Sequence, residues 1–331
     1  MVAKVFSILF SLFFVACAGG NETDEPIFPS NLSQSMMFVD PTSQSMQAYK
    51  EALSEGNSLE QEALKYIANQ PSFIWLSSDW IPGPTGIKDR VSEYRTQSKG
   101  KILGFILYDV PGRDCGQYSS GGVKEINKYL SIVQQIIDGL EDSKAIIILE
   151  PDALGLSVKE GCELPLQTAT QAISKAVSML SESKNIKVYL DAGHGKWLTV
   201  EQIGPLLKVA NIEKADGFVL NISNYVSTEV NHEYGVRIAK HFGNKKFLID
   251  TSRNGRGQFN EDSEEPWCNP PGRALGQKPS FKSKLDGVEG FIWAKRPGES
   301  DGTCRKGAPA GVFMLERAVE LYANAKKDGL I

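Results

Sequence analysis

Residues 145–152 read AIIILEPD, five apolar residues in succession followed at once by polar ones. The run is short and rich in isoleucine, whose branched side chain favours an extended strand. Every position of the run is apolar, so the strand would be buried on both faces, as the strands of a parallel sheet are. We therefore interpret residues 145–150 as a buried parallel strand.

Six further short apolar runs lie along the chain, at residues 72–76, 103–109, 187–191, 217–222, 246–250 and 290–294. Longer amphipathic stretches occur between the runs and after the last one, for example at residues 123–140, 166–181, 228–242 and 311–326. Alternating strands and helices predict a parallel α/β fold, which is either a barrel or an open doubly wound sheet. No G-x-G-x-x-G follows the first runs, which weakens the dinucleotide-binding form of the open sheet.

The composition is that of a globular protein, and its weakly acidic charge suits a neutral substrate without identifying one. A single α/β barrel accommodates the 331 residues, and the 41% of hydrophobic residues allows a large core. The net charge is −4 and there is no basic cluster, so nucleic acid and anionic membrane surfaces are not expected partners. We expect a monomer.

The first residues have the pattern of an export signal. Lys4 precedes an apolar run over residues 5–16 that is too short to span a bilayer, and the residues around Cys17 fit a small-residue cleavage site. The alternative is a bacterial lipoprotein signal, in which a lipid on Cys17 anchors the protein to a membrane. We predict a signal peptide at 1–18, a polar tether at 19–30 and one domain at 31–331, outside the cytoplasm in either case.

Four cysteines remain beyond Cys17, namely Cys115, Cys162, Cys268 and Cys304. An even number in an oxidising compartment predicts two disulfides, and spacing does not choose among the three pairings. A zinc site is disfavoured because there is no C-x-x-C spacing and the three histidines are scattered.

Polar residues follow the apolar runs and indicate the chemistry. In a barrel, the carboxyl ends of the strands point into one shared mouth. Hydrolysis of a glycosidic bond requires a proton donor for the leaving oxygen and, in most such enzymes, a second carboxyl group. Four aspartates are candidates, Asp114, Asp152, Asp191 and Asp301, and the neighbouring Trp, Tyr and Arg residues favour a carbohydrate site over four isolated helix caps.

The motifs that follow the runs occur in a characteristic order. They are YDVPGRDCG at 108–116, LEPDAL at 149–154, YLDAGH at 189–194, NISNY at 221–225, DTSRNG at 250–255, WCN at 267–269 and KRPGESDG at 295–302. With these motifs the chain resembles glycoside hydrolase family 6, which contains cellobiohydrolases and endoglucanases, over about residues 35–328. The resemblance implies a distorted, TIM-barrel-like (β/α) barrel of about seven parallel strands, hydrolysis with inversion, and no metal or cofactor.

The resemblance also implies roles for five residues near the scissile bond. Asp152 is the expected proton donor, and Asp114 is expected to lie beside it and to hold its proton in place, since two close carboxyl groups do not both ionise easily. Asp301 matches the position proposed as catalytic base, which acts directly or through waters. Ser120 resembles the hydroxyl that holds such a water, and Tyr108 the ring that distorts the sugar.

Further positions match the family's substrate contacts. The tryptophans expected to stack on sugar faces are Trp75, Trp197 and Trp267, because a pyranose presents an apolar C–H face to a flat ring. The polar contacts expected are Ser77, Asp191, His194, Asn224, Lys295 and Glu299. Ser77 stands where the family often has Asp, so its contact is the least certain, and we interpret Trp80 and Trp293 as structural.

Departures from the cellobiohydrolases favour an endoglucanase that cuts internal bonds of cellulose-type chains. The segments between Asp114 and Gly121 and between Asp301 and Cys304 are short, whereas cellobiohydrolases have longer ones that roof the cleft. Val200 also replaces an outlying tryptophan. The alternatives are a processive cellobiohydrolase and an inactive glucan-binding homologue, although the latter is disfavoured because Asp152 is present.

The resemblance also gives a reason to choose among the disulfide pairings. We predict Cys115–Cys162 and Cys268–Cys304, because each bond would hold a loop that carries one of the proposed active-site carboxylates.

Overall fold

The fold is taken from a computed structural model that describes residues 28–29, 32–55, 57–162, 164–259 and 265–331. The predicted signal peptide at 1–18, Cys17 and nearly all of the predicted tether at 19–30 lie outside the described residues. The predicted domain at 31–331 contains every strand and helix of the description.

Seven parallel strands form one sheet in the order in which they occur along the chain. They are β1 (Ile74–Leu76), β2 (Leu103–Leu107), β3 (Ala145–Leu149), β4 (Ile186–Asp191), β5 (Gly217–Leu220), β6 (Lys246–Asp250) and β7 (Val288–Ile292). Ser72 and Trp293 form a parallel bridge between the two edges, where the Phe73 N–H donates to the Trp293 carbonyl at 2.9 Å. The prediction of a distorted barrel with about seven parallel strands is confirmed.

The apolar residues of each strand serve two separate cores. Ile146 and Ile148 of β3 pack inside the barrel with Tyr189 and Val219 from neighbouring strands. The alternate residues of β3, including Ile147, face the helices. Because successive side chains of a strand point to opposite faces, both faces of β3 must be apolar. This explains why residues 145–149 are all apolar.

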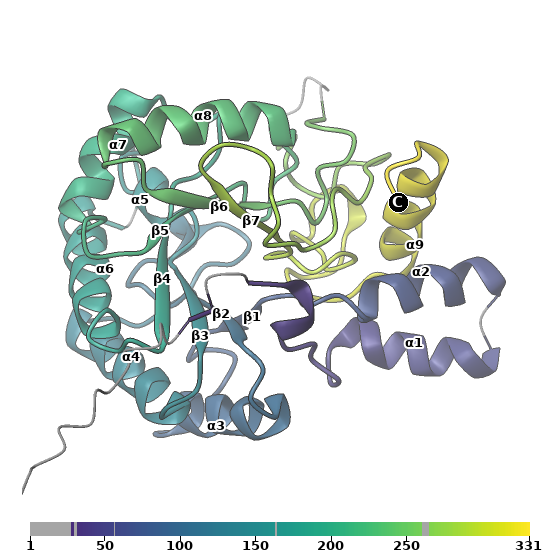
Figure 1. Cartoon of the computed structure of the whole chain (residues 1–331), viewed down its shortest axis with the longest axis horizontal. Coiled ribbons are helices and arrows are strands. Elements are labelled where there is room, and N and C mark those ends of the chain that lie inside the picture. The colour runs from purple at the N-terminus through teal and green to yellow at the C-terminus, as the bar shows by residue number, and fades with distance from the viewer. Residues whose placement is uncertain (1–27, 30–31, 56, 163, 260–264) are drawn as a thin grey trace, which may run out of the picture.

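Helices connect the strands and cover the outside of the sheet. They are α1 (Gln44–Glu55), α2 (Ser58–Ala68), α3 (Gly86–Ser98), α4 (Ile126–Leu140), α5 (Ala153–Leu156), α6 (Leu166–Leu180), α7 (Val200–Val209), α8 (Thr228–His241) and α9 (Leu315–Lys327), with 3₁₀ turns η1 (Gln34–Met36), η2 (Asp114–Gly116) and η3 (Cys304–Lys306). Figure 1 shows α3, α4, α6, α7 and α8 along the outer face of the sheet, whereas α1, α2 and α9 form a separate group. Ala63 and Ile67 of α2 pack with Leu321 of α9 and with Trp293, so this group covers the bridged edge of the barrel.

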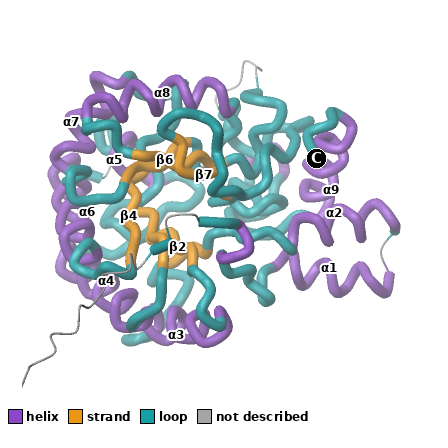
Figure 2. The backbone as a smooth tube through the Cα atoms, in the orientation of Figure 1, coloured by secondary structure: helices purple, strands orange, loops and turns teal. Residues whose placement is uncertain are grey.

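Long loops follow β6 and β7 and lie between the sheet and α9 (Figure 2). They contain Trp267 and Asp301, whereas the shorter loops after β2 and β3 contain Asp114 and Asp152. The strand order therefore places two of the predicted carboxylates on one side of the barrel mouth and the third on the other.

Candidate active site

A cleft of about 790 Å³ opens at the carboxyl ends of the strands. The predicted site residues that line it are Trp75, Tyr108, Asp114, Asp152, His194, Trp197, Asn224, Trp267, Lys295, Glu299 and Asp301. Trp75 lies in β1 and the others lie in the loops after β2 to β7, as expected for a barrel whose strand ends share one mouth.

Asp152 lies at the turn between β3 and α5. Its backbone is left-handed (φ 67°), a conformation that Asp and Asn adopt more readily than other non-glycine residues, and its N–H donates to Asp191 Oδ2 at 2.9 Å. Burial and the nearby carboxylates of Asp191 and Asp114 raise the pKa of Asp152 well above its usual range. All three causes disfavour the charged form, so the side chain is suited to carry a proton at neutral pH.

Asp114 is fixed by its own loop. Its Oδ2 accepts the Ser119 N–H at 2.7 Å, and the neighbouring Cys115 forms a disulfide with Cys162, in the loop after α5. Burial raises the pKa of Asp114, while the Ser119 N–H and the charge of Arg113 oppose the rise. The first predicted disulfide is thus present and joins the loop of Asp114 to the segment that follows Asp152.

Arg113 holds the Asp114 loop against the end of β2. It is 2% exposed and donates to the Ser119 carbonyl at 2.7 Å, the Tyr108 carbonyl at 2.8 Å and Ser77 Oγ at 2.7 Å. Ser77 in turn donates to Asp109 and is fully buried. The Ser77 hydroxyl is therefore buried between Arg113 and Asp109, and its predicted contact with a sugar stays a prediction.

Two other predicted residues lie off the cleft surface. Asp191 is 4% exposed and accepts the N–H groups of Asp152 and Gly193, so it supports the predicted donor from below. Ser120 is exposed but does not line the cleft, whereas its neighbour Ser119 does. The predicted contacts of Asp191 with the substrate and of Ser120 with a water stay predictions.

Asp301 lies on the opposite wall among hydrogen-bond donors and cations. Its carboxylate pairs with Arg253 Nη1 at 2.8 Å, and it accepts the Tyr225 hydroxyl at 3.1 Å and the Asn269 N–H at 3.0 Å. Lys295 Nζ lies 3.9 Å away, and burial lowers the pKa of that ammonium. The fixed donors hold the Asp301 carboxylate in one orientation at the edge of the cleft.

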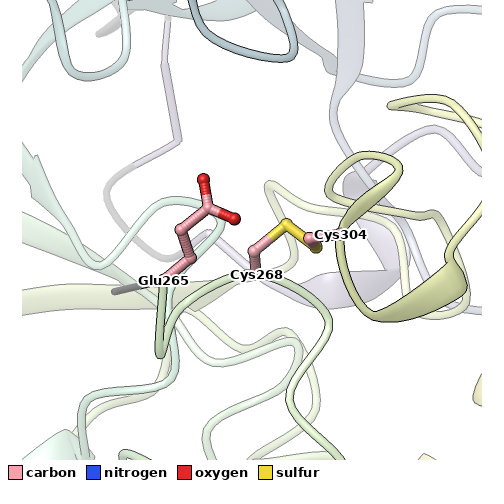
Figure 3. A group of neighbouring side chains, drawn as sticks. All are labelled: Glu265, Cys268 and Cys304. Carbon is pink, nitrogen blue, oxygen red and sulfur yellow. A yellow bond between two sulfur atoms is a disulfide. The ribbon is translucent and has the colours of Figure 1, made fainter. Parts of the chain in front are cut away.

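The second predicted disulfide, Cys268–Cys304, is also present, with Glu265 beside it (Figure 3). Glu265 and the two sulfurs lie within 4.8 Å of one another, the spacing of a small metal site. A disulfide offers no thiolate to a metal, so the pair of cysteines acts here as a covalent link between the loops of Trp267 and Asp301. Glu265 instead accepts the Tyr118 hydroxyl at 2.9 Å.

Aromatic side chains line the cleft at several points. The Trp197 ring packs closely over Gly155 and Gly193, where an added Cβ would come within about 3.0 Å of the ring, so the chain requires glycine at both positions. His194 lies beside this ring, and burial lowers its pKa to about 4, which keeps the imidazole neutral near pH 7.

The two remaining tryptophans differ from each other. Trp293 is fully buried, as its interpretation as a structural residue requires. Trp80, to which we gave the same interpretation, is instead 50% exposed and lines the cleft. It follows β1 by only a few residues, and this position could have indicated a place at the barrel mouth.

The sequence from residue 32 to residue 325 matches the family model described as glycosyl hydrolases family 6. The chain belongs to this family.

Proteins named endoglucanases are among its relatives. It is 38% identical to endoglucanase A of Cellulomonas fimi over 87% of the chain and 61% of that protein, so it spans about three fifths of the relative's length. It is 34% identical to endoglucanase 1 of Streptomyces halstedii over 77% of the chain and 79% of that protein. A solved structure of endoglucanase Cel6 from Mycobacterium tuberculosis, in complex with methyl-cellobiosyl-4-deoxy-4-thio-β-D-cellobioside, superimposes with a TM-score of 0.81 at 37% identity, covering 88% of this chain and 97% of that one.

One buried carboxyl group of this family 6 site has no role in the motif-based prediction. Glu150 is 1% exposed and accepts the N–H groups of Asp109 and Val110 at 3.0 and 3.1 Å. Burial raises its pKa to about 8. Glu150 thus joins the end of β3 to the start of the loop that carries Asp114. In the sequence, only its position next to Pro151 and Asp152 could have indicated this structural role.

The neutral variant Asp114→Asn tests the electrostatic part of the site. The charge of Asp114 is one of the causes that raise the pKa of Asp152, so its removal lowers that pKa. Because a donor acts only while protonated, activity should be lost at a lower pH than in the parent protein. We expect the alkaline limb of kcat/KM against pH to move to lower pH. An alkaline limb that stays in place, or moves to higher pH, would contradict this coupling.

Proposed function

We propose that the protein is an inverting endo-β-1,4-glucanase that hydrolyses internal bonds of cellulose-type chains. The observation that carries the proposal is Asp152, a carboxyl group with a strongly raised pKa at the wall of a cleft whose opposite wall carries Asp301. Family membership and the endoglucanase names of the relatives support it. The substrate is a neutral polysaccharide, in keeping with the aromatic lining of the cleft.

The proposed reaction is a single displacement. Asp152 gives its proton to the glycosidic oxygen as the bond to the anomeric carbon breaks, and the departing chain leaves with a free hydroxyl group. Water attacks the anomeric carbon from the opposite face and releases its proton toward Asp301, directly or through further waters. Asp114 and Asp191 keep the donor protonated before the reaction, because their negative charges disfavour a third one nearby.

One contact favours the alternative of a processive cellobiohydrolase. The Tyr118 hydroxyl donates to Glu265, and the Tyr118 ring lies 6.1 Å from the Trp267 ring in an edge-to-face arrangement. The loop after β2 therefore touches the loop after β6 at Tyr118. The short segments at 114–121 and 301–304 and the names of the relatives still favour the internal mode of cleavage.

Hydrolysis of carboxymethylcellulose distinguishes cleavage of internal bonds from processive cleavage. An endoglucanase cuts long chains in their interior, so the viscosity of the solution should fall steeply while few soluble sugars have appeared. A cellobiohydrolase should release cellobiose with little change in viscosity. Release of cellobiose at nearly constant viscosity would replace the proposed mode by the alternative.

We further propose that the protein is exported, either secreted or anchored at the surface through Cys17. Two disulfides support an oxidising compartment. None of the helices among the described residues is long and apolar enough to cross a membrane.

A further inference from the structure

Trp80 is the most exposed of the five tryptophans, all of which lie in the described residues. It follows β1, and half of its surface is accessible while it lines the cleft. A large aromatic side chain exposed in a concave, polar-rimmed site indicates a contact with a ligand more often than a packing role. None of the sequence motifs on which the resemblance to the family rests includes this residue.

Trp80 contacts Arg113 and Tyr108 on one side. The Arg113 guanidinium lies 5.0 Å from the centre of the Trp80 ring and 4.9 Å from that of Tyr108. Because Arg113 is 2% exposed, it covers the inner side of the indole, and the accessible surface of Trp80 lies on the outer side. The indole N–H donates to no atom of the part of the chain that the structure describes, and it is therefore available to a hydroxyl group. A ring that already packs against a buried side chain loses less conformational freedom on binding than one without such a contact.

The ring continues a row of aromatic side chains. Trp75 and Tyr108 meet edge to face with centroids 5.2 Å apart, and Tyr108 and Trp80 have centroids 6.3 Å apart. In the strand order of the barrel, Trp80 lies at the β1 end of the mouth, whereas Trp197 follows β4 on the far side. The three rings therefore form a row on the β1 and β2 side of the mouth, in which Tyr108 contacts both tryptophans.

We propose that Trp80 is an additional sugar-binding platform, which stacks on one glucose unit of the chain beyond those next to the scissile bond. This inference rests on the proposed function. Its ligand is the apolar C–H face of a pyranose, with the indole N–H available to a hydroxyl group. The platform lengthens the stretch of β-glucan that the cleft holds and so favours long substrates over short ones.

The test compares cellooligosaccharides of three to six glucose units as substrates for the wild type, Trp80→Phe and Trp80→Ala. A sugar contact predicts that Trp80→Ala raises KM about tenfold on the longest substrate and much less on the shortest, with kcat nearly constant across the series. Trp80→Phe keeps a flat ring and should show a smaller loss. Val209→Ala removes another exposed apolar side chain, which is not among the residues that line the cleft, and serves as the matched control.

Two outcomes would overturn the inference. If Trp80 serves only to pack against Arg113, Trp80→Ala lowers kcat by the same factor on every substrate length, because Arg113 holds the loop of Asp114. If the ring has no role, KM depends on the number of glucose units in the same way for the variants and the wild type. Wild-type hydrolysis of cellohexaose is measured first, and its absence would count against the proposed function, separately from the role of Trp80. Thermal unfolding of each variant verifies that it is folded.

Discussion

Asp152→Asn should lower kcat on unactivated β-glucan by about 10²–10⁴-fold or more, while cellooligosaccharides still bind. The amide keeps the shape of the side chain but has no proton to give to a leaving sugar oxygen, which is a poor leaving group without one. The fold should persist because Asn also tolerates the left-handed backbone found at this position. The measurement is kcat on soluble glucan together with oligosaccharide affinity.

The matched control for this variant is Asp142→Asn. Asp142 is an exposed aspartate in the turn after α4, outside the residues that line the cleft. The same change of charge there should leave kcat within about twofold of the wild type, as expected for a surface substitution away from special features. A variant at Asp152 that retained most of the wild-type rate would remove this residue from the role of donor.

Asp301→Asn should lower both the stability and the activity of the protein, and a second substitution distinguishes the two effects. It removes the counter-charge of Arg253, whose side chain is 2% exposed, and breaking a buried ion pair in this way costs about 3–5 kcal/mol of unfolding free energy. It also removes the proposed acceptor of the proton from water, for which we expect about a 10²–10⁴-fold fall in kcat. Denaturant unfolding and kcat are both measured.

The double variant Asp301→Asn/Arg253→Met should regain a large part of the lost stability, because the buried Arg253 cation is removed together with its counter-charge. It should not regain activity. If kcat returned together with stability, Asp301 would serve only to neutralise Arg253, and the base would have to be sought elsewhere. If stability did not return, the Tyr225 and Asn269 contacts of Asp301 would carry more of it than the ion pair.

The fold could be predicted from the sequence because both faces of each strand are buried, and buried strands appear as unbroken apolar runs. The last strand shows the limit of this reasoning. The run at 290–294 predicts a strand there, whereas β7 spans Val288–Ile292. A register shift between Phe247 and Leu248 of β6 changes the pairing, and Trp293 bonds instead with the first edge of the barrel. The register shift and the bridge form only when the sheet closes into a barrel, so the local sequence contains no pattern that predicts them.

The candidate site was predictable to the extent that it follows strand ends. Asp114, Asp152 and Asp301 were found because each lies in a recognisable motif near a strand. The contact between Tyr118 and Glu265 was not, since it joins loops 147 residues apart in the sequence. The burial of Ser77 and Asp191 beneath the cleft also follows from tertiary packing and not from their neighbours in the chain.

The central claim is a single displacement with Asp152 as acid, and its most direct test is the anomeric form of the fresh product. Proton NMR of a hydrolysate recorded within the first minutes distinguishes the two anomers before they interconvert. Attack of water on a β-bond from the opposite face predicts that the α-anomer of the new reducing end appears first. Early β-anomer would contradict the account, because it requires two displacements and a covalent intermediate on a carboxylate of the enzyme.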